Sequence, residues 1–330
     1  MGPRSSVNSN IGNYLEKETK LKFNHAIFLT YAAVILVVFG CAQVGNDIPP
    51  LHQQYLGQKP PGDNPEIFGP DFVSDKNWAE HCQVAISPQG DEIFWSAWTG
   101  AYKTEDGEKN TEQIFYSKLE NGIWTKPQIA EFTRENPHGL NGGPVYSLDG
   151  KYLFFYQVKS PWVSSAMNTY YVEKTSSGWS DKPIDVGQPY NSEGRNYSPV
   201  FTRTGNAYKN DMRVITKFTY KDAKFTLTDS VVIHKDYRPG WNIYVSPMED
   251  YVIFAAIHEG GFGDLDLYVS FKTQNNSWGD PINMGPKINT ERRERFPTVS
   301  PDGKYLFFMR HTETQDFFWV STSILDDLRE

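Results

Sequence analysis

All-β structure is the fold class that this sequence predicts, and three observations point to it. Aromatic residues are abundant, with 19 Tyr, 21 Phe and 9 Trp among 330 residues, and aromatic side chains suit the half-buried surface of a β-sheet. Gly (26) and Pro (21) are frequent enough to end many short strands in turns. Long helical periodicity is almost absent after residue 50, which favours short strands over helices.

A two-strand pattern recurs along the chain, consisting of a short apolar strand, a four-residue turn and a second strand. Its copies are QVAISPQGDEIFWSAW (83–98), GPVYSLDGKYLFFYQ (143–157), SPVFTRTGNAY (198–208), NIYVSPMEDYVIFAA (242–256) and FPTVSPDGKYLFFMR (296–310). The turns begin at Ser87, Ser147, Thr202, Ser246 and Ser300, at spacings of 60, 55, 44 and 54 residues. Such periods are typical of β-propeller blades. The repeat count predicts five blades, or six if one of the two long first intervals holds another blade.

Further segments recur in phase with the turns. A third strand is expected at 113–119, 169–175 and 266–272, and an outer fourth strand at the Trp-to-Pro segments 121–127, 177–183 and 276–281. The third repeat lacks that Trp-to-Pro signature over 214–233 but still alternates like paired strands. The last repeat lacks a fourth strand, and residues 65–74 are free to supply it, which would remove two open sheet edges. We therefore expect a single propeller of four-stranded antiparallel sheets, closed by an N-terminal strand.

The N-terminus carries a targeting signal. Lys20 and Lys22 precede an apolar run of fifteen residues (26–40) that stops at Cys41, as in a signal peptide whose apolar region is short for a membrane span. The ending VVFGC is similar to a bacterial lipobox, so we expect a lipoprotein signal at 1–40 and lipidation at Cys41. A signal anchor that continues past Cys41 is the alternative. The polar, Pro/Gly-rich segment 41–63 is then a flexible tether, and 64–330 is the propeller domain.

The last two repeats resemble a known family. ERFPTVSPDGKYLFF (294–308), and GGFGDLDLYVS (260–270) followed by NSWGDPINMGPKINT (276–290), are similar to the TolB-type, WD-like propeller repeat of bacterial envelope proteins. The resemblance covers roughly residues 64–330. It implies a propeller fold and an extracytoplasmic location, in the periplasm or at the outer membrane. It implies no single activity, and because no Gly-x-Ser-x-Gly elbow occurs, a peptidase is not expected.

Most residues with reactive side chains have a structural interpretation. Ser300 recurs in phase in the other repeats, which is expected of a turn residue, whereas a catalytic serine need occur only once. Cys82 is expected to be a small buried side chain. The seven histidines show no paired spacing, so neither a metal nor a cofactor is predicted. The net charge of −8 argues against a nucleic-acid partner.

The side chains that do not repeat are better candidates for a site. In a propeller the innermost strands begin near the central axis, so residues just before the turn strands gather at one mouth of the channel. Counting back from the five turns places Cys82, Gly142, Tyr197, Trp241 and Arg295 in one ring. One step outward lie His81, Asn141, Asn196, Gly240 and Glu294, and one step further Glu80, Arg195 and Arg293.

These rings predict a ligand-binding mouth formed by Glu80, His81, Asn141, Arg195, Asn196, Tyr197, Trp241, Arg293, Glu294 and Arg295. Aromatic faces and arginine forks suit an acidic sugar, a peptide terminus or a polar loop of an envelope protein. Non-catalytic binding at the cell envelope is the favoured function. A carbohydrate-active lyase or hydrolase using Glu80, His81 and an arginine is the alternative, and a scaffold that uses the blade sides is a third. The charged side chains could also simply pair with one another.

Overall fold

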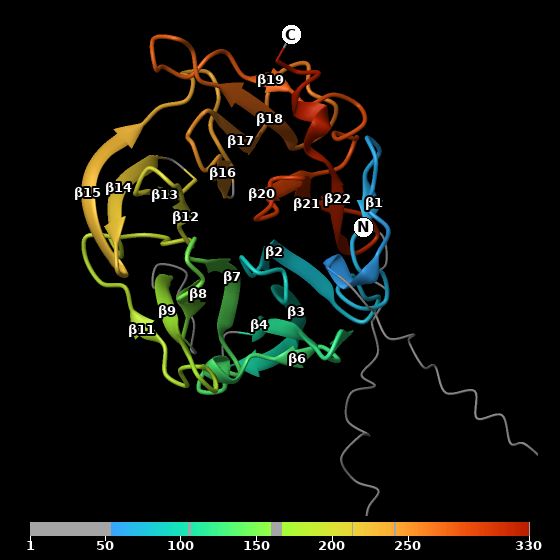
Figure 1. Ribbon diagram of the computed structural model, residues 1–330, viewed down its shortest axis with the longest axis vertical. Helices are drawn as coiled ribbons and strands as arrows, with labels where there is room; N and C mark the ends of the chain where they lie inside the picture. The colour runs from blue at the N-terminus through green and yellow to red at the C-terminus, as the bar shows by residue number, and fades with distance from the viewer. Residues whose placement is uncertain (1–53, 105–106, 160–166, 213, 241, 330) are drawn as a thin grey trace, which may run out of the picture. The chain divides into compact units, whose positions relative to one another are not determined.

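The computed structural model describes residues 54–104, 107–159, 167–212, 214–240 and 242–329 (Figure 1). The predicted signal peptide, Cys41 and most of the predicted tether lie outside the described residues. The described part of the tether is packed, since Leu56 is buried and the Tyr55 ring meets Tyr305 edge to face and Trp319 at a tilt, with ring centroids 5.0 and 5.7 Å away.

The described residues are almost entirely β-structure, with three short 3-10 turns, η1 (Tyr55–Gly57), η2 (Glu131–Thr133) and η4 (Thr322–Leu325). None of their helical segments has the length and apolar character needed to cross a membrane. The strands of the first half are β1 (Glu66–Ile67), β2 (Ala79–Ile86), β3 (Glu92–Thr104), β4 (Gly107–Glu120), β5 (Ile123–Trp124), β6 (Gln128–Ile129), β7 (Leu140–Tyr146), β8 (Tyr152–Val158), β9 (Asn168–Thr175), β10 (Gly178–Trp179) and β11 (Ile184–Asp185). Those of the second half are β12 (Val200–Phe201), β13 (Asn206–Asn210), β14 (Ile215–Lys221), β15 (Lys224–Val231), β16 (Ile243–Val245), β17 (Tyr251–Ala256), β18 (Asp266–Phe271), β19 (Ile282–Asn283), β20 (Glu294–Val299), β21 (Tyr305–His311) and β22 (Gln315–Ser321).

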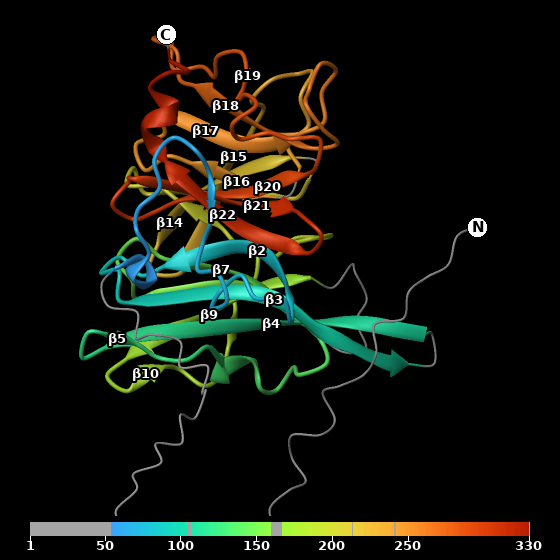
Figure 2. The ribbon, with the colours of Figure 1, turned by 90° about the vertical axis from the view of Figure 1, so that its right-hand side faces the viewer.

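The strands form antiparallel groups, each named here by its innermost strand. The β12, β16 and β20 groups are separate four-stranded sheets, and the β2 and β7 groups are joined by one parallel contact between Glu112 and Leu140. Viewed from above, β2, β7, β12, β16 and β20 lie nearest the centre of the domain and their partners fan outward (Figure 1). The side view shows the β3–β4 hairpin running past the ends of the neighbouring strands (Figure 2). The predicted all-β propeller class is confirmed.

The N-terminal strand β1 belongs to the last group. Glu66 pairs with Trp319 and Ile67 with Phe318, so the sheet order is β1-β22-β21-β20. Residues 65–74 were expected at this position. The first and last strands of the described residues therefore share one sheet, and they also share a hydrophobic core in which Phe68 and Trp319 are fully buried.

Proline divides the outer strand of three groups. Trp124, Trp179 and Trp278 each pair with the third strand, at Leu119, Lys174 and Lys272. Pairing resumes beyond the proline at β6, β11 and β19. Proline donates no ladder hydrogen bond, so it is tolerated at such an edge. The β12 group lacks the Trp-to-Pro signature, and its outer strand β15 is accordingly unbroken over eight residues.

The recurring turns are fixed by their serine hydroxyls. Ser300 Oγ donates to Asp302 Oδ1 at 2.7 Å and accepts from the backbone N–H of Tyr305 at 3.0 Å. Ser147 makes the same pair of bonds with Asp149 and Tyr152. The structural interpretation of Ser300 is confirmed.

Buried carboxylates tie neighbouring groups together. Glu249, in the β16–β17 turn, accepts hydrogen bonds from Tyr208 Oη at 2.8 Å and Asn206 Nδ2 at 2.6 Å, and pairs with Lys217 Nζ at 3.3 Å. Its partners belong to the β12 group. Burial alone would raise the pKa of Glu249, but these hydrogen bonds, one from Thr204 and the charge of Lys217 lower the pKa to about 2.

We expect Glu249→Gln to lower the free energy of unfolding at pH 7 by about 2 kcal/mol. The pKa of Glu249 lies below its ordinary value of 4.5, so its stabilisation is complete above that value and is lost as pH falls towards 2. The difference in the free energy of unfolding between the wild-type and variant chains should therefore become smaller as the pH is lowered. Urea unfolding at pH 7 and pH 3 measures it, with the exposed Glu259→Gln as control. A difference that is constant with pH would contradict the assignment.

Candidate functional site

A bulge recurs at the same place in three of the innermost strands, β2, β7 and β20. In β7, Gly142 pairs with Tyr156 and Val145 with Phe154, so two residues oppose one. The β20 strand has the same spacing between Arg295 and Thr298. In β2 the interruption runs from His81 to Ala85 and holds three residues, one more than in β7 or β20.

The extra residue in β2 corrects the predicted rings. Counting back from the turns put Cys82 level with Gly142 and Arg295, but the pairing shows that His81 takes that position. Glu80 is then level with Asn141 and Glu294. The sequence could not show this shift, because a bulge adds a residue without altering the apolar pattern of the flanking strand.

The bulge places two consecutive side chains together. Neighbouring residues of a regular strand point to opposite faces of the sheet, yet Cys82 Sγ lies 3.3 Å from His81 Nδ1. The reason is the backbone of Cys82, which is left-handed with φ of 66°. The first bulge residues of β7 and β20, Gly143 and Phe296, are also left-handed, with φ of 62° and 55°.

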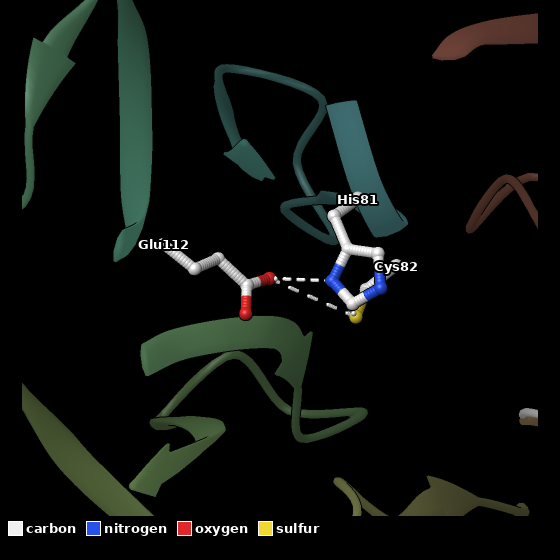
Figure 3. Close-up of side chains that lie close together, drawn as sticks. All are labelled: His81, Cys82 and Glu112. Carbon is white, nitrogen blue, oxygen red and sulfur yellow. Dashed lines mark hydrogen bonds and ion pairs between the residues drawn. The ribbon is translucent and has the colours of Figure 1, made fainter. Parts of the chain in front are cut away.

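Glu112 lies against His81 and Cys82 (Figure 3), and Tyr156 completes an inner cluster of these four residues. Glu112, on β4, places Oε1 2.8 Å from His81 Nδ1. Tyr156, on β8, donates from Oη to Glu112 Oε2 at 2.6 Å and lies 3.2 Å from Cys82 Sγ. Gly142 leaves room for these groups, because a Cβ there would overlap the Glu112 carboxylate and the Tyr156 hydroxyl.

The inner cluster combines burial with concentrated charge. Cys82 and Glu112 are fully buried, and the His81 side chain is 15% exposed. Burial alone would lower the pKa of His81, but Cys82 and Glu112 outweigh it and raise the pKa to about 10. Burial, together with the same two neighbours, also raises the pKa of Tyr156.

This arrangement differs from a nucleophile–base–carboxylate triad. In a triad, one imidazole nitrogen faces the nucleophile and the other faces the carboxylate. Here Cys82 Sγ and Glu112 Oε1 both approach Nδ1 of His81. Nδ1 cannot accept the proton of the Cys82 thiol while its own N–H donates to the Glu112 carboxylate. The geometry suits charge pairing or ligation better than nucleophilic catalysis.

Arg295 lies beside the inner cluster. Its Nη2 is 2.7 Å from Gln315 Oε1 and 2.8 Å from His311 Nε2, and its guanidinium lies over the Phe296 ring at 5.1 Å. Burial lowers the pKa of Arg295 to about 10, so it stays charged at neutral pH. Burial and the charge of Arg295 lower the pKa of His311, whose neutral ring can accept the Arg295 hydrogen bond.

Tyr197 and Arg195 extend the same surface. The Tyr197 ring meets Tyr156 edge to face at 5.8 Å, and Tyr197 Oη lies 3.6 Å from Met212 Sδ, which Arg195 also contacts. We call His81, Arg195, Tyr197 and Arg295 the mouth. Trp241 lies outside the described residues. Arg293 forms an exposed ion pair with Asp264, so its guanidinium is engaged there.

The remaining predicted site residues hold the loops that enter the inner strands. The Glu80 carboxylate accepts from the backbone of Asp75, at 3.1 Å. The other three bond to a residue four or five positions earlier. Asn141 donates to the Asn136 carbonyl, Asn196 accepts from the Ser192 backbone N–H and donates to the Ser192 carbonyl, and Glu294 accepts from the Thr290 hydroxyl. All four side chains are buried. Burial raises the pKa of Glu80 to about 9, so this side chain is neutral at pH 7. A ligand-binding role for these four stays a prediction.

A cavity of about 280 Å³ lies at the opposite, turn-bearing end of the inner strands. Prolines and aliphatic side chains line much of it, with Arg203 and Tyr244 among its polar groups. Gln83 and Asn242 also line it, and Asn242 Nδ2 donates to Gln83 Oε1 at 2.6 Å. Sequence reasoning missed this cavity and also Glu112 and Tyr156. Glu112 precedes the strand expected at 113–119, and only the longer β4 carries its side chain to the mouth.

Comparison with known proteins places no family name on the chain. No family model matches it, and no curated protein does. Solved structures similar to it include prolyl oligopeptidase B from Galerina marginata (15% identity, TM-score 0.41, 71% of this chain and 31% of that one). A protein of Agrobacterium tumefaciens assigned as a TolB matches at 13% identity and TM-score 0.43, over 70% of this chain and 69% of that one. An arabinanase of Bacillus subtilis matches at 11% identity and TM-score 0.42, over 73% and 94%. This chain thus spans about a third of the oligopeptidase.

Proposed function

We propose that this propeller binds a carboxylate-bearing glycan or peptide at the mouth, without catalysis, outside the cytoplasm. The observation that carries the proposal is the charged Arg295 beside the inner cluster, close to Tyr197, which shares Met212 as a contact with the exposed Arg195. Guanidinium groups form strong, directional hydrogen bonds with carboxylates. The Tyr197 and Tyr156 rings are 4% and 1% exposed, so they pack beside Arg295 and do not present a face to the ligand.

Arg295 is the central group of this proposal. Its position is set by Gln315, His311 and Phe296, so its guanidinium is held before any ligand arrives. A preorganised group loses less conformational entropy on binding. Burial also strengthens its electrostatic interactions, because the local dielectric constant is lower than in water.

The alternative of a carbohydrate-active enzyme needs an acid and a second catalytic group set against one bond. The side chains suggested for it from sequence separate in the structure. Glu80 binds the backbone of Asp75, while His81 contacts Glu112. Binding is therefore the function that the geometry supports better, and turnover of a bound oligosaccharide is the result that would favour the enzyme.

We further propose that Cys41 carries a lipid that anchors the propeller to a bacterial membrane. The support is the sequence pattern of Lys20, Lys22 and the apolar run that ends at Cys41. A lipid anchor would place the mouth outside the cytoplasm, where an envelope protein, a glycan or a peptide is available as a partner.

Arg295→Gln should weaken binding of an oligosaccharide that contains uronic acid, or of a peptide with a free carboxyl terminus, by roughly 10- to 100-fold, the usual worth of a hydrogen bond to a charged group. Isothermal titration calorimetry on the full chain measures this. Methyl-esterified sugar and amidated peptide should bind weakly to both chains. Arg292→Gln is the matched control, because this nearby arginine is exposed and its guanidinium donates to the Thr312 backbone carbonyl. Equal affinity for acid and ester would contradict the proposal.

Cys41→Ala should abolish incorporation of labelled palmitate when the chain is expressed in a bacterial host, and should leave the propeller folded. Gel autoradiography detects the label, and thermal unfolding checks the fold. Cys82→Ala serves as the control, since the only other cysteine of the chain is buried in the domain. Labelling that persists in Cys41→Ala would exclude lipidation at this residue.

A further inference from the structure

We propose that His81, Cys82 and Glu112 bind a divalent transition-metal ion of the zinc type. The three side chains bring an imidazole nitrogen, a thiol sulfur and a carboxylate oxygen within 4.8 Å of one another. They come from β2 and β4, and Figure 3 shows the Glu112 carboxylate facing both His81 Nδ1 and Cys82 Sγ. This inference goes beyond the binding of an anionic ligand and does not depend on it.

The distances between the donor atoms fit a metal site after small adjustments. Nδ1 of His81 lies 2.8 Å from Glu112 Oε1 and 3.3 Å from Cys82 Sγ, and Sγ lies 4.0 Å from Oε1. Tetrahedral zinc with its usual bond lengths would hold such donors about 3.3 to 3.6 Å apart. Each separation is therefore within about half an ångström of the ligated value, a shift that side-chain rotation supplies.

The donor set selects among metals. A thiolate and an imidazole favour zinc and its chemical relatives, whereas calcium and magnesium prefer oxygen ligands alone. Three protein ligands also leave a fourth tetrahedral position for water or for a ligand group. The His81 side chain is partly exposed, so an ion can reach the cluster past its ring.

The surroundings hold the donors as outer partners of metal sites do. Tyr156 Oη donates to Oε2 of Glu112 at 2.6 Å, which leaves Oε1 directed at His81 and Cys82. Hydrogen bonds of this kind orient ligating carboxylates. The His81 ring is packed between Trp98 and Phe296, with centroids at 4.8 and 5.3 Å, so its orientation is fixed as well.

The backbone conformation of Cys82 sets the direction of its side chain. A left-handed residue other than glycine costs about 1 kcal/mol or more; the equivalent residue of β7 is Gly143, which avoids that cost, and that of β20 is Phe296, which bears it as Cys82 does. A cysteine at this position gains nothing from the conformation itself. The conformation does bring its sulfur to the same side as His81, which ligation of one ion requires.

The test uses cobalt(II) as a spectroscopic substitute for zinc, added to the reduced full chain. We expect a sulfur-to-cobalt charge-transfer band and the intense visible bands of tetrahedral cobalt, both removed by an equivalent of zinc. Cys82→Ser should eliminate the charge-transfer band, and Glu112→Gln should weaken cobalt binding by at least about 100-fold, since even outer partners are worth about 10- to 100-fold. Cys41→Ser is the matched control and should keep the full spectrum.

Three outcomes would overturn the inference. The first is that the wild-type chain shows no charge-transfer band, and the second is that the band is lost in Cys41→Ser but kept in Cys82→Ser. The third is that, with zinc added, the melting temperature of the wild-type chain is no higher than that of Cys82→Ser. The melting temperatures without metal show whether Cys82→Ser is folded, and if it is not, Cys82→Gly replaces it because glycine accepts the left-handed backbone. If the chain binds cobalt or zinc but binds no carboxylate ligand, only the proposed function is refuted.

Discussion

The bulge in the innermost strand is the constraint on which the site of this protein depends. A regular β2 would send His81 and Cys82 to opposite faces of the sheet. The left-handed backbone of Cys82 instead turns both side chains toward Glu112. Bulges also increase local twist and redirect the chain, and those of β7 and β20 occur at the corresponding place. The same kind of bulge thus recurs in β2, β7 and β20. In β2 the bulge contains one additional residue, and this brings the side chains of the inner cluster together.

The repeated framework makes the mouth asymmetric. His81, Gly142 and Arg295 occupy equivalent positions in three strands. His81 contributes an imidazole, Arg295 contributes a guanidinium, and Gly142 has no side chain and leaves space. Gly142 is as important as the charged residues, because any side chain there would fill the volume taken by Glu112 and Tyr156. One step before these positions, every described side chain with a polar group is used to hold an entering loop. The framework and the mouth therefore use neighbouring residues of the same strand for different purposes.

The two proposals can operate together. A metal ion at the inner cluster would add positive charge next to Arg295, and both groups attract the carboxylate of a ligand. Glu112 and Cys82 supply the negative charge that makes the ion acceptable in a buried place. Arg195 lies further along the mouth and would contact parts of a ligand away from the ion.

Periodicity in the sequence by itself determined the all-β propeller class, the positions of the serine turns and the strand that residues 65–74 add beside the last repeat. These features follow from local rules, since turn chemistry and two-residue alternation act between near neighbours in the chain. Which side chains meet at the mouth was decided only by the tertiary structure. One extra bulge residue moved His81 into the ring, and the long β3–β4 hairpin carried Glu112 to it. Asn141, Asn196 and Glu294 were expected at the mouth, but their side chains turn to the entering loops. Their hydrogen bonds to those loops span only four or five positions. The contacts of Glu112 with His81 and Cys82 span 31 and 30 positions, and they depend on register and twist, which no local pattern in this sequence records.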